Sequence, residues 1–337
     1  MLTPEQTETR TMRALQVHEW GSIDALQFTD VPRPTPMPTE VLIRVKAVGL
    51  NPVDLLTIEG QGYMSAVSLP HVPSWDISGV IEEVGYGTRF TVGDEVYGMP
   101  WFPRAAGATA EYVVAPARQV ALKASTQTFE EAAAAPLAGL TAYQMLVDYA
   151  HVGRGSRVVV NAAGGGCGHL AVQIGKALGA EVIGIASTAK VDFVKGLGAD
   201  RVIDYTTTVP GDVLTEVDAV IDFVGGDAGL DLFRVLRTGG TFVEAHGASM
   251  AGKLTDAAHH YGVDAKGYLV DPDYAGLDAL REMFEDGTVK VAVSHAYSFD
   301  EARDAFQHLA DQQSTYWISK SAHRRSAHAT GKIVLSL

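Results

Sequence analysis

The chain has 337 residues, of which 47% are hydrophobic and 20% charged, so it is neither fibrous nor disordered and is long enough for two domains. Its 40 acidic and 26 basic side chains give a formal charge of −14, which repels phosphate backbones and anionic lipid surfaces. We therefore expect neither a nucleic-acid partner nor a membrane partner.

One cysteine, Cys167, occurs in the chain. A single cysteine cannot form an internal disulfide or a four-cysteine metal site, and it suits a reducing compartment. Residues 1–11 are polar and lack the apolar core of a signal peptide, and no run of about 18 apolar residues is present. We therefore expect a cytoplasmic protein whose leader plays no part in the fold.

The first third of the chain contains short strand patterns. Residues 41–47 alternate between apolar and polar positions, and short candidates bounded by Gly or Pro recur at 78–84, 94–97 and 111–115. This pattern is typical of a small β-rich barrel or sandwich. The proline-rich segment 32–38 cannot pair within a central strand, so we expect an exposed connector there.

From about residue 130 the pattern changes. Ala-rich helical segments at 130–135 and 140–149 are followed by strands and helices that alternate along the chain. The alternating segments are 157–160, 168–178, 181–186, 190–197, 219–223, 229–236 and 240–245. Such alternation predicts a parallel sheet with helices on both faces, because parallel neighbours need a long crossover. The fold class is therefore α/β, with a β-rich domain followed by a doubly wound one.

A glycine-rich turn, residues 161–168, joins the strand at 157–160 to the next helix. Its spacing, Ala162-x-x-Gly165-x-x-Gly168, is a variant of the dinucleotide fingerprint. Small residues let the chain turn sharply and bring backbone N–H groups close to a pyrophosphate, while the helix N-terminus offers a partial positive charge. The strand, turn, helix and second strand together predict a dinucleotide site, and the alternative is a tight turn without a ligand.

The residues after the second strand of this unit indicate the coenzyme. Where NAD enzymes usually place Asp or Glu for the ribose 2′-hydroxyl, this chain has Ser187 and Thr188, followed by Lys190. Two hydroxyls and an ammonium can bind a 2′-phosphate, so we expect NADPH rather than NADH. The alternative for Lys190 is a solvated lysine at a helix start.

Seven sequence blocks follow one another along nearly the whole chain. They are residues 48–54 (Val-Gly-Leu-Asn-Pro-Val-Asp), 89–98, 110–114, 136–143, the glycine turn, 197–205 and 331–335. In order and spacing they resemble the medium-chain dehydrogenase/reductase superfamily, specifically its zinc-less quinone oxidoreductase and enoyl reductase branch. The resemblance implies a GroES-like catalytic domain at 1–137, completed by 291–337, and a Rossmann domain at 138–290. It also implies an interdomain cleft and a homodimer built through the Rossmann domain.

The resemblance further implies the residues that bind the coenzyme. Asn51 and Thr141 would contact the nicotinamide end, Tyr205 and Lys190 would lie near the adenosine phosphate, and the glycine turn would hold the pyrophosphate. The full expected set is Asn51, Thr141, Ala163, Gly164, Gly165, Gly166, Cys167, Ser187, Thr188, Lys190, Tyr205, Val224, His246 and Gly247.

The same comparison predicts that no metal is bound. Zinc relatives carry a cysteine where this chain has Asn51 and Gly-His-Glu where it has residues 74–76 (Ser-Trp-Asp), and their cysteine-rich lobe has no counterpart between residues 98 and 110. Zinc takes thiolate, imidazole or carboxylate ligands, which amide and indole groups do not replace. We therefore expect a zinc-independent enzyme.

Without a Lewis-acid metal, a conjugated carbonyl or quinone is the easier hydride acceptor, because it spreads the incoming charge onto its own oxygen. Tyr63 and Asn51 are the catalytic candidates. Related enoyl reductases are similar in placing a tyrosine shortly after the Asn-Pro-x-Asp block, although here it is shifted by one residue, and a buried wall tyrosine is the alternative. We expect the substrate pocket to be lined by Tyr63, Trp75, Trp101 and Tyr268.

Three functions stay open at this point. The first is an NADPH-dependent enone, enoyl or quinone reductase, the second a specialised natural-product reductase or reductive cyclase, and the third an NADPH-binding structural or sensing protein without turnover. One departure from the family is an insertion at 311–330, which includes Tyr316, Trp317 and the basic pair Arg324-Arg325. Long connections of this kind are often functional, and this one could cover the cleft or widen a dimer contact.

Overall fold

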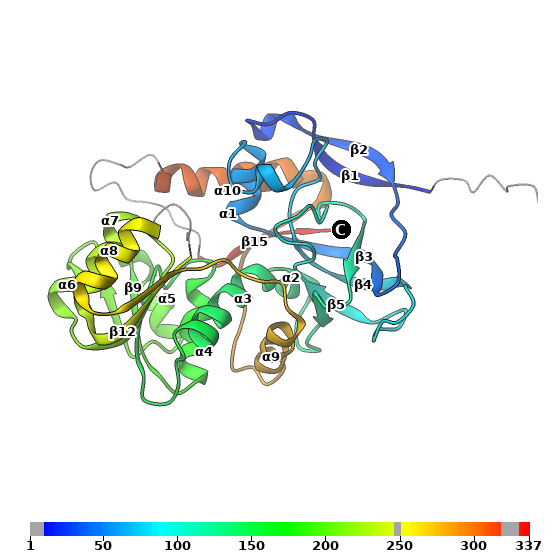
Figure 1. The fold of residues 1–337 in the computed structure, drawn as a ribbon. Coiled ribbons are helices and arrows are strands. Elements are labelled where there is room, and N and C mark those ends of the chain that lie inside the picture. The colour runs from blue at the N-terminus through cyan, green and yellow to red at the C-terminus, as the bar shows by residue number, and fades with distance from the viewer. Residues whose placement is uncertain (1–9, 246–250, 318–329) are drawn as a thin grey trace, which may run out of the picture.

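The computed structural model describes residues 10–245, 251–317 and 330–337, which form two domains on separate sheets. The first domain has a mainly antiparallel sheet, and the second has a parallel one (Figure 1). The expected α/β class, with a β-rich domain and a doubly wound domain, is confirmed.

The first domain holds a seven-stranded sheet and a two-stranded ribbon. The sheet has the order β14-β15-β3-β4-β5-β7, and β6 also pairs with β3. The strands are β1 (Thr11–Val17) and β2 (Leu26–Pro32) of the ribbon, then β3 (Glu40–Leu50), β4 (Asp76–Val84), β5 (Glu95–Gly98), β6 (Tyr112–Pro116), β7 (Val120–Leu122), β14 (Val293–Ser298) and β15 (Lys332–Ser336). The four predicted strands correspond to β3, β4, β5 and β6, and residues 33–39 form no strand, as the prolines led us to expect.

The C-terminal strand completes the first domain. β15 lies between β14, to which it is parallel, and β3, to which it is antiparallel, so Ile333 pairs with Leu50 (Figure 1). Gly331 precedes β15 with a φ of 82°, and a Cβ there would lie 2.1 Å from the Ala292 carbonyl oxygen. Only glycine therefore lets the chain enter the sheet at this point.

The second domain holds six parallel strands in the order β10-β9-β8-β11-β12-β13. They are β8 (Arg157–Asn161), β9 (Glu181–Ala186), β10 (Arg201–Asp204), β11 (Val217–Asp222), β12 (Leu236–Glu244) and β13 (Asp264–Gly267). The chain runs outward from β8 to β10 and then returns to the other side of β8 with β11. This reversal beside β8 makes the sheet doubly wound.

Ten α-helices accompany the two sheets among the described residues. They are α1 (Pro52–Ile58), α2 (Phe129–Ala133), α3 (Pro136–Gln144), α4 (Gly168–Ala177), α5 (Val191–Gly196), α6 (Pro210–Val213), α7 (Gly226–Leu230), α8 (Ala251–Tyr261), α9 (Tyr274–Glu285) and α10 (Ala302–Trp317). A π-helical turn (Met145–Tyr149) extends α3. None of the helices in the described ranges is both long and apolar enough to cross a bilayer.

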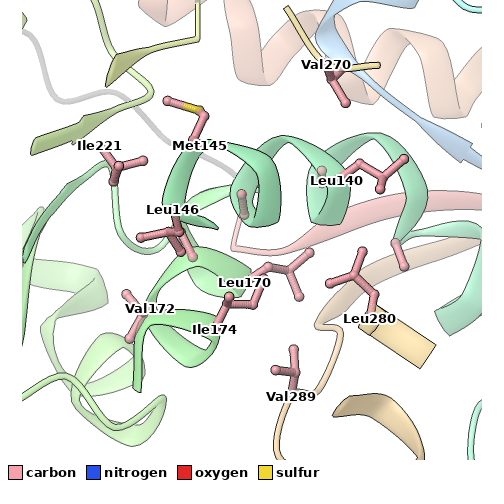
Figure 2. Packing of buried hydrophobic residues seen from close by; sticks show 14 of the residues in the cluster. Leu140, Met145, Leu146, Leu170, Val172, Ile174, Ile221, Val270, Leu280 and Val289 are labelled. Atoms are coloured by element: carbon pink, nitrogen blue, oxygen red, sulfur yellow. The ribbon is translucent and has the colours of Figure 1, made fainter. Parts of the chain in front are cut away.

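Helices cover both faces of the parallel sheet. Val158 and Val160 of β8 point to a core shared with α3, α4 and α9, which Figure 2 shows around Leu170 and Leu280. Val159, between them, points to the opposite core with Phe242. β8 therefore has two buried faces, which explains why it is an unbroken apolar run.

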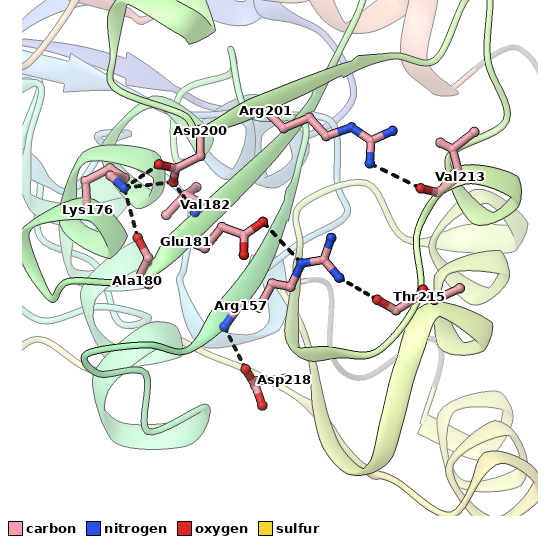
Figure 3. Close-up of polar contacts among 10 residues, drawn as sticks. All are labelled: Arg157, Lys176, Ala180, Glu181, Val182, Asp200, Arg201, Val213, Thr215 and Asp218. Carbon is pink, nitrogen blue, oxygen red and sulfur yellow. Dashed lines mark hydrogen bonds and ion pairs between the residues drawn. The ribbon is translucent and has the colours of Figure 1, made fainter.

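Polar contacts hold the strand starts at the edge opposite the glycine turn (Figure 3). Arg157 at the start of β8 pairs with Glu181 at the start of β9, and its backbone N–H donates to Asp218 at 2.6 Å. Asp200, just before β10, accepts from Lys176 and from the Val182 N–H. Because these contacts lie at the amino ends of the strands, they leave the carboxyl ends unobstructed. Open α/β sheets bind their ligands at the carboxyl ends.

Two parts of the second domain differ from the prediction. The helix predicted at 229–236 is split into α7 and a 3₁₀ turn (Asp231–Val235), because Leu236 already begins β12. β10 and β13 were not predicted at all. β13 reads Asp264-Ala265-Lys266-Gly267 and lies at the sheet edge, where a strand does not need an apolar sequence.

The helix α10, which precedes β15, packs into the core of the first domain, and a substitution in α10 can test this packing. Phe306 of α10 is fully buried in a cluster that includes Ile333 and Leu335 of β15. We expect Phe306→Ala to lower the free energy of unfolding by about 3–5 kcal/mol, because it leaves a cavity in a packed core. The side chain of the neighbouring Gln307 is exposed and donates to Asp311 on the same helix, so Gln307→Ala is the matched control. Denaturant melts of both variants measure the difference, and equal losses would contradict this packing.

Candidate functional site

The glycine turn joins β8 to α4 in a conformation that excludes larger residues. Ala162 adopts a positive φ of 58°, and a Cβ on Gly168 would lie 2.1 Å from the Ala162 carbonyl oxygen. The Gly165 N–H donates to the same oxygen at 2.9 Å, which closes the turn. The N-terminus of α4, a ten-residue helix, lies directly after it. The turn therefore fits a phosphate group, which needs close backbone approach and the positive end of a helix.

Two buried side chains join the turn to the loop after β11. Asn161 Nδ2 donates to Asp222 Oδ1 at 2.8 Å, and Asp222 also accepts from the backbone N–H groups of Val224 and Gly225. Asp222 has no exposed surface. The expected coenzyme residue Val224 is thus fixed next to the turn, at the point where the strand order reverses. The prediction missed Asp222, although an Asp that ends an apolar strand before Gly-Gly is a readable signal.

The two residues at the ends of the expected pyrophosphate set have different surroundings. Ala163 is fully buried and its N–H donates to the Ile185 carbonyl, so it ties the turn to β9. Cys167 is the N-cap residue of α4, and burial raises the pKa of its thiol to about 11. The thiol is therefore protonated near neutral pH and is not a reactive nucleophile.

At the end of β9 the expected 2′-phosphate residues lie beside a carboxylate. Thr188 Oγ1 donates to Asp204 Oδ2 at 2.6 Å and lies 2.7 Å from Thr206 Oγ1. Tyr205 is 42% exposed, and its N–H donates to the Ala186 carbonyl. Ser187 is half-buried and leads into this turn. The sequence did not predict that Asp204 would engage the Thr188 hydroxyl.

Lys190 is not a solvated lysine. It is 8% exposed, its stem packs against Gly164, and Nζ donates to the Gly164 carbonyl at 3.4 Å. Burial lowers the pKa of its ammonium to about 8. The alternative of a solvated helix-start lysine is therefore wrong, and the side chain lies against the glycine turn.

At the other end of the site, Asn51 lies in a buried polar cluster between the domains. It is the N-cap residue of α1, and Nδ2 donates to Asp76 Oδ2 at 2.8 Å. Lys332 Nζ donates to Asn51 Oδ1 and lies 3.8 Å from Asp76 Oδ2. The second Asp76 oxygen accepts from the Leu137 N–H at the start of α3. The sequence did not predict that Asp76 or the side chain of Lys332 would lie beside Asn51.

Burial shifts the two carboxyl groups of this cluster by different amounts. It raises the pKa of Asp54 to about 8, against the lowering effect of the Asn51 N–H, which donates to its carboxyl at 2.7 Å. It raises the pKa of Asp76 to about 6, and the nearby Lys332 ammonium limits that rise. The negative charge of the cluster is therefore favoured on Asp76, which faces Lys332, over Asp54.

Thr141 belongs to the same region through α3. It is 6% exposed, and Oγ1 donates to the Leu137 carbonyl one turn earlier in the helix at 2.6 Å. Because Leu137 itself bonds to Asp76, α3 carries Thr141 at a fixed distance from Asn51. The structure therefore brings both expected nicotinamide residues to one junction.

The four expected substrate residues do not share one cavity, although two of them lie on one aromatic wall. Tyr63 and Trp75 both pack edge-on against Phe102, at centroid distances of 5.1 and 5.2 Å. Trp75 is fully buried, and its indole N–H donates to the Arg104 carbonyl. Phe102 and Tyr268 line a hollow of about 990 Å³ beside the π-helical turn.

Trp101 lines a separate hollow of about 320 Å³, on the side of the first domain that carries Met12 and Val72. Two other expected residues, His246 and Gly247, lie outside the described residues, and so does the part of the 311–330 insertion that follows α10. The first part of that insertion continues α10 as far as Trp317.

Comparisons with known proteins agree with this arrangement. An alcohol dehydrogenase GroES-like domain model matches residues 37–125, and a zinc-binding dehydrogenase model matches residues 197–315. The chain is 33% identical over 335 residues to 2-methylene-furan-3-one reductase of Solanum lycopersicum, with 96% of this chain and 79% of that relative covered. This chain belongs to the medium-chain dehydrogenase/reductase superfamily. Its members are oxidoreductases, and this chain is quinone oxidoreductase-like.

Two further comparisons are consistent with this branch of the medium-chain dehydrogenase/reductase superfamily. The chloroplastic NADPH-dependent alkenal/one oxidoreductase of Arabidopsis thaliana is 31% identical, with 99% of this chain and 82% of the relative covered. The solved structure of the quinone oxidoreductase from Coxiella burnetii is 32% identical with a TM-score of 0.86, and the match covers 97% of this chain and all of that chain.

Among the described residues, those around Asn51 do not form a donor set that suits the zinc in the name of one family model. Where zinc members of the superfamily carry a cysteine, Asn51 presents an amide whose oxygen and nitrogen already bond to Lys332 and Asp76. An ammonium in contact with this cluster opposes a second cation there. Within the described ranges, no three His, Cys, Asp or Glu side chains come close enough to hold a metal ion.

The glycine turn gives a direct test of where the coenzyme binds. We expect Gly168→Ala to weaken NADPH binding at least 10-fold, because the new Cβ would push the Ala162 carbonyl and open the turn that approaches the phosphates. Gly196→Ala is the matched control, since a Cβ there meets nothing within 4 Å. Fluorescence titration with NADPH measures both variants, and equal affinities would show that the nucleotide binds elsewhere.

Proposed function

We propose that this protein is a zinc-independent, NADPH-dependent reductase that transfers a hydride to a conjugated carbonyl or quinone-type acceptor. The observation that carries the proposal is the Asn51 cluster, in which an amide, a carboxylate and an ammonium occupy the position that binds the catalytic metal in zinc relatives. Such a cluster favours chemistry that does not need a Lewis acid. Conjugated acceptors meet that condition because they delocalise the incoming charge themselves.

Residues of the second domain support NADPH as the coenzyme. The glycine turn and the α4 N-terminus would hold the pyrophosphate. Ser187, Thr188 and Lys190 would bind the adenosine ribose and its 2′-phosphate. When bound, the nicotinamide supplies the hydride. A relative that is 31% identical carries NADPH dependence in its name, which supports NADPH over NADH.

On the acceptor side, the residues of the chain orient the substrate and supply a proton donor. Phe102 and Tyr268 line the larger hollow together with polar side chains such as Gln144, and their aromatic faces suit a flat unsaturated molecule. Burial raises the pKa of Tyr63, so its hydroxyl stays protonated near neutral pH and could donate to the oxygen on which negative charge develops. Relatives named for a furanone and for alkenals and alkenones support this acceptor class.

We also propose a homodimer in the cytoplasm. Among the described strands, β13 lies at the edge of the parallel sheet and pairs only with β12, so it can pair with a second copy through an isologous contact. The single cysteine suits a reducing compartment.

An acceptor panel tests the proposed activity. Purified protein with NADPH should lose absorbance at the nicotinamide band when quinones, simple enones or enoyl thioesters are added, and treatment with a zinc chelator should not reduce the rate. Turnover of only one complex natural-product intermediate would instead indicate a specialised biosynthetic reductase. NADPH binding with no acceptor consumed would refute the enzymatic proposal and leave a sensing or structural role.

Coenzyme preference gives a second test. Lys190→Met keeps the stem that packs against Gly164 and removes only the ammonium. It should weaken NADPH at least 10-fold while NADH changes little, because only NADPH carries the 2′-phosphate that an ammonium would bind. Lys195→Met on α5, the helix that Lys190 precedes, is the matched control, since Lys195 is exposed and forms an ion pair with Asp192. Michaelis constants for the two coenzymes measure the effect. Equal losses for both would mean that Lys190 only supports the glycine turn.

A further inference from the structure

Lys332 is a buried lysine at the junction of the two domains. It is the first residue of β15 and is 4% exposed. Removing an ammonium from water costs several kcal/mol unless partners replace the solvent. The polar partners that replace the solvent here lie in the first domain, and the methylene stem of Lys332 contacts the second domain.

One set of contacts lies in the first domain, where β3 meets α1. The ammonium donates to the Leu50 carbonyl at 3.0 Å as well as to Asn51 Oδ1. Because Asn51 Nδ2 donates to Asp76, the Asn51 amide is fixed at both of its polar ends. The amide cannot flip without breaking its bonds to Lys332 and Asp76.

The second set of contacts lies in the glycine turn. A Cβ built on Gly166 would lie 3.4 Å from Lys332 Cδ, so the stem of the lysine runs along the outside of the turn. The charge also reaches Cys167, whose thiol pKa it lowers against the larger rise caused by burial. A single side chain therefore contacts the residue expected at the nicotinamide end and the turn expected to hold the pyrophosphate.

The backbone around Lys332 allows little adjustment. Gly331 has no room for a Cβ, the Lys332 N–H donates to the Ala292 carbonyl at 2.8 Å, and Ser294 Oγ donates to the Lys332 carbonyl. The ammonium thus projects from a fixed strand rather than from a loop. A side chain held in this way is suited to fix the geometry of its neighbours.

We propose that Lys332 is a positioning residue for hydride transfer, because it fixes the Asn51 amide relative to the glycine turn. This inference rests on the function proposed above. It assigns Lys332 no contact with substrate and no role as a proton donor. Its effect on the rate comes through Asn51, since a small displacement of reacting groups has a large effect on the rate.

Lys332→Met tests the ammonium, because it removes the charge and keeps the stem beside Gly166. We expect kcat to fall about 10–100-fold, as small misplacements do. The dissociation constant of NADPH, measured by fluorescence without an acceptor, should change less than about 3-fold, a binding free-energy change under 1 kcal/mol. Lys290→Met is the matched control: Lys290 is exposed and bonds through its backbone to Gln173.

A double-mutant cycle shows whether Lys332 acts through Asn51. If it does, Lys332→Met should cost little additional kcat in an Asn51→Ala background, because the partner that it positions is already absent. The proposal would be overturned if the fold-loss of kcat in the double variant equals the product of the losses in the two single variants. It would also be overturned if Lys332→Met loses as much NADPH affinity as kcat. If Lys332→Met does not fold, the charge-balanced pair Lys332→Met/Asp76→Asn replaces it in the cycle.

The wild-type protein separates this inference from the proposed function. If wild type consumes NADPH with an acceptor and Lys332→Met has an unchanged kcat, only the role of Lys332 is refuted. If wild type turns over no acceptor in the panel, the proposed function fails first and the positioning role fails with it.

Discussion

The pairing of β15 with β3 and β14 is the interaction on which the rest of the structure depends. It brings Lys332 next to Leu50, 282 positions away in the sequence. The chain reaches β14 and β15 from the second domain, where Gln173 of α4 bonds to both backbone groups of Lys290, and His169 Nε2 accepts from the Ala292 N–H. The helix that follows the glycine turn therefore also holds the segment that leads into the catalytic sheet.

Burial keeps His169 suited to this role. Its ring has no exposed surface, and burial lowers the pKa of the imidazole to about 4. Near neutral pH the ring is uncharged, so Nε2 can accept a hydrogen bond while Nδ1 faces the Gly165 carbonyl at 3.0 Å. The contact from the glycine turn to the interdomain segment is thus made by a neutral residue.

Sequence reasoning recovered the elements that have a local cause. Val158 to Val160 are apolar because both sheet faces are buried, and Gly168 is glycine because no Cβ fits beside Ala162, so both features could be predicted from the sequence.

Features that depend on distant partners could not be predicted in this way. β13 has no apolar signal, and the positions of Asp76 and Lys332 beside Asn51 follow from the packing of β4 and β15, not from any spacing along the chain. For the same reason Trp75 and Trp101 were assigned to one pocket, although the structure buries the first and places the second on a different hollow.

The two ends that we expect for the coenzyme site follow the same physical rule. At the end expected for the adenosine the stem of Lys190 packs against Gly164, and at the end expected for the nicotinamide the stem of Lys332 packs beside Gly166. Each lysine uses its methylene groups to support a turn that has no side chains of its own, while its ammonium donates to a nearby backbone carbonyl. A turn built from glycine gains close approach to phosphate but loses the packing that would keep it rigid. The neighbouring lysines supply that packing, which explains how a turn without side chains of its own can have a well-fixed backbone.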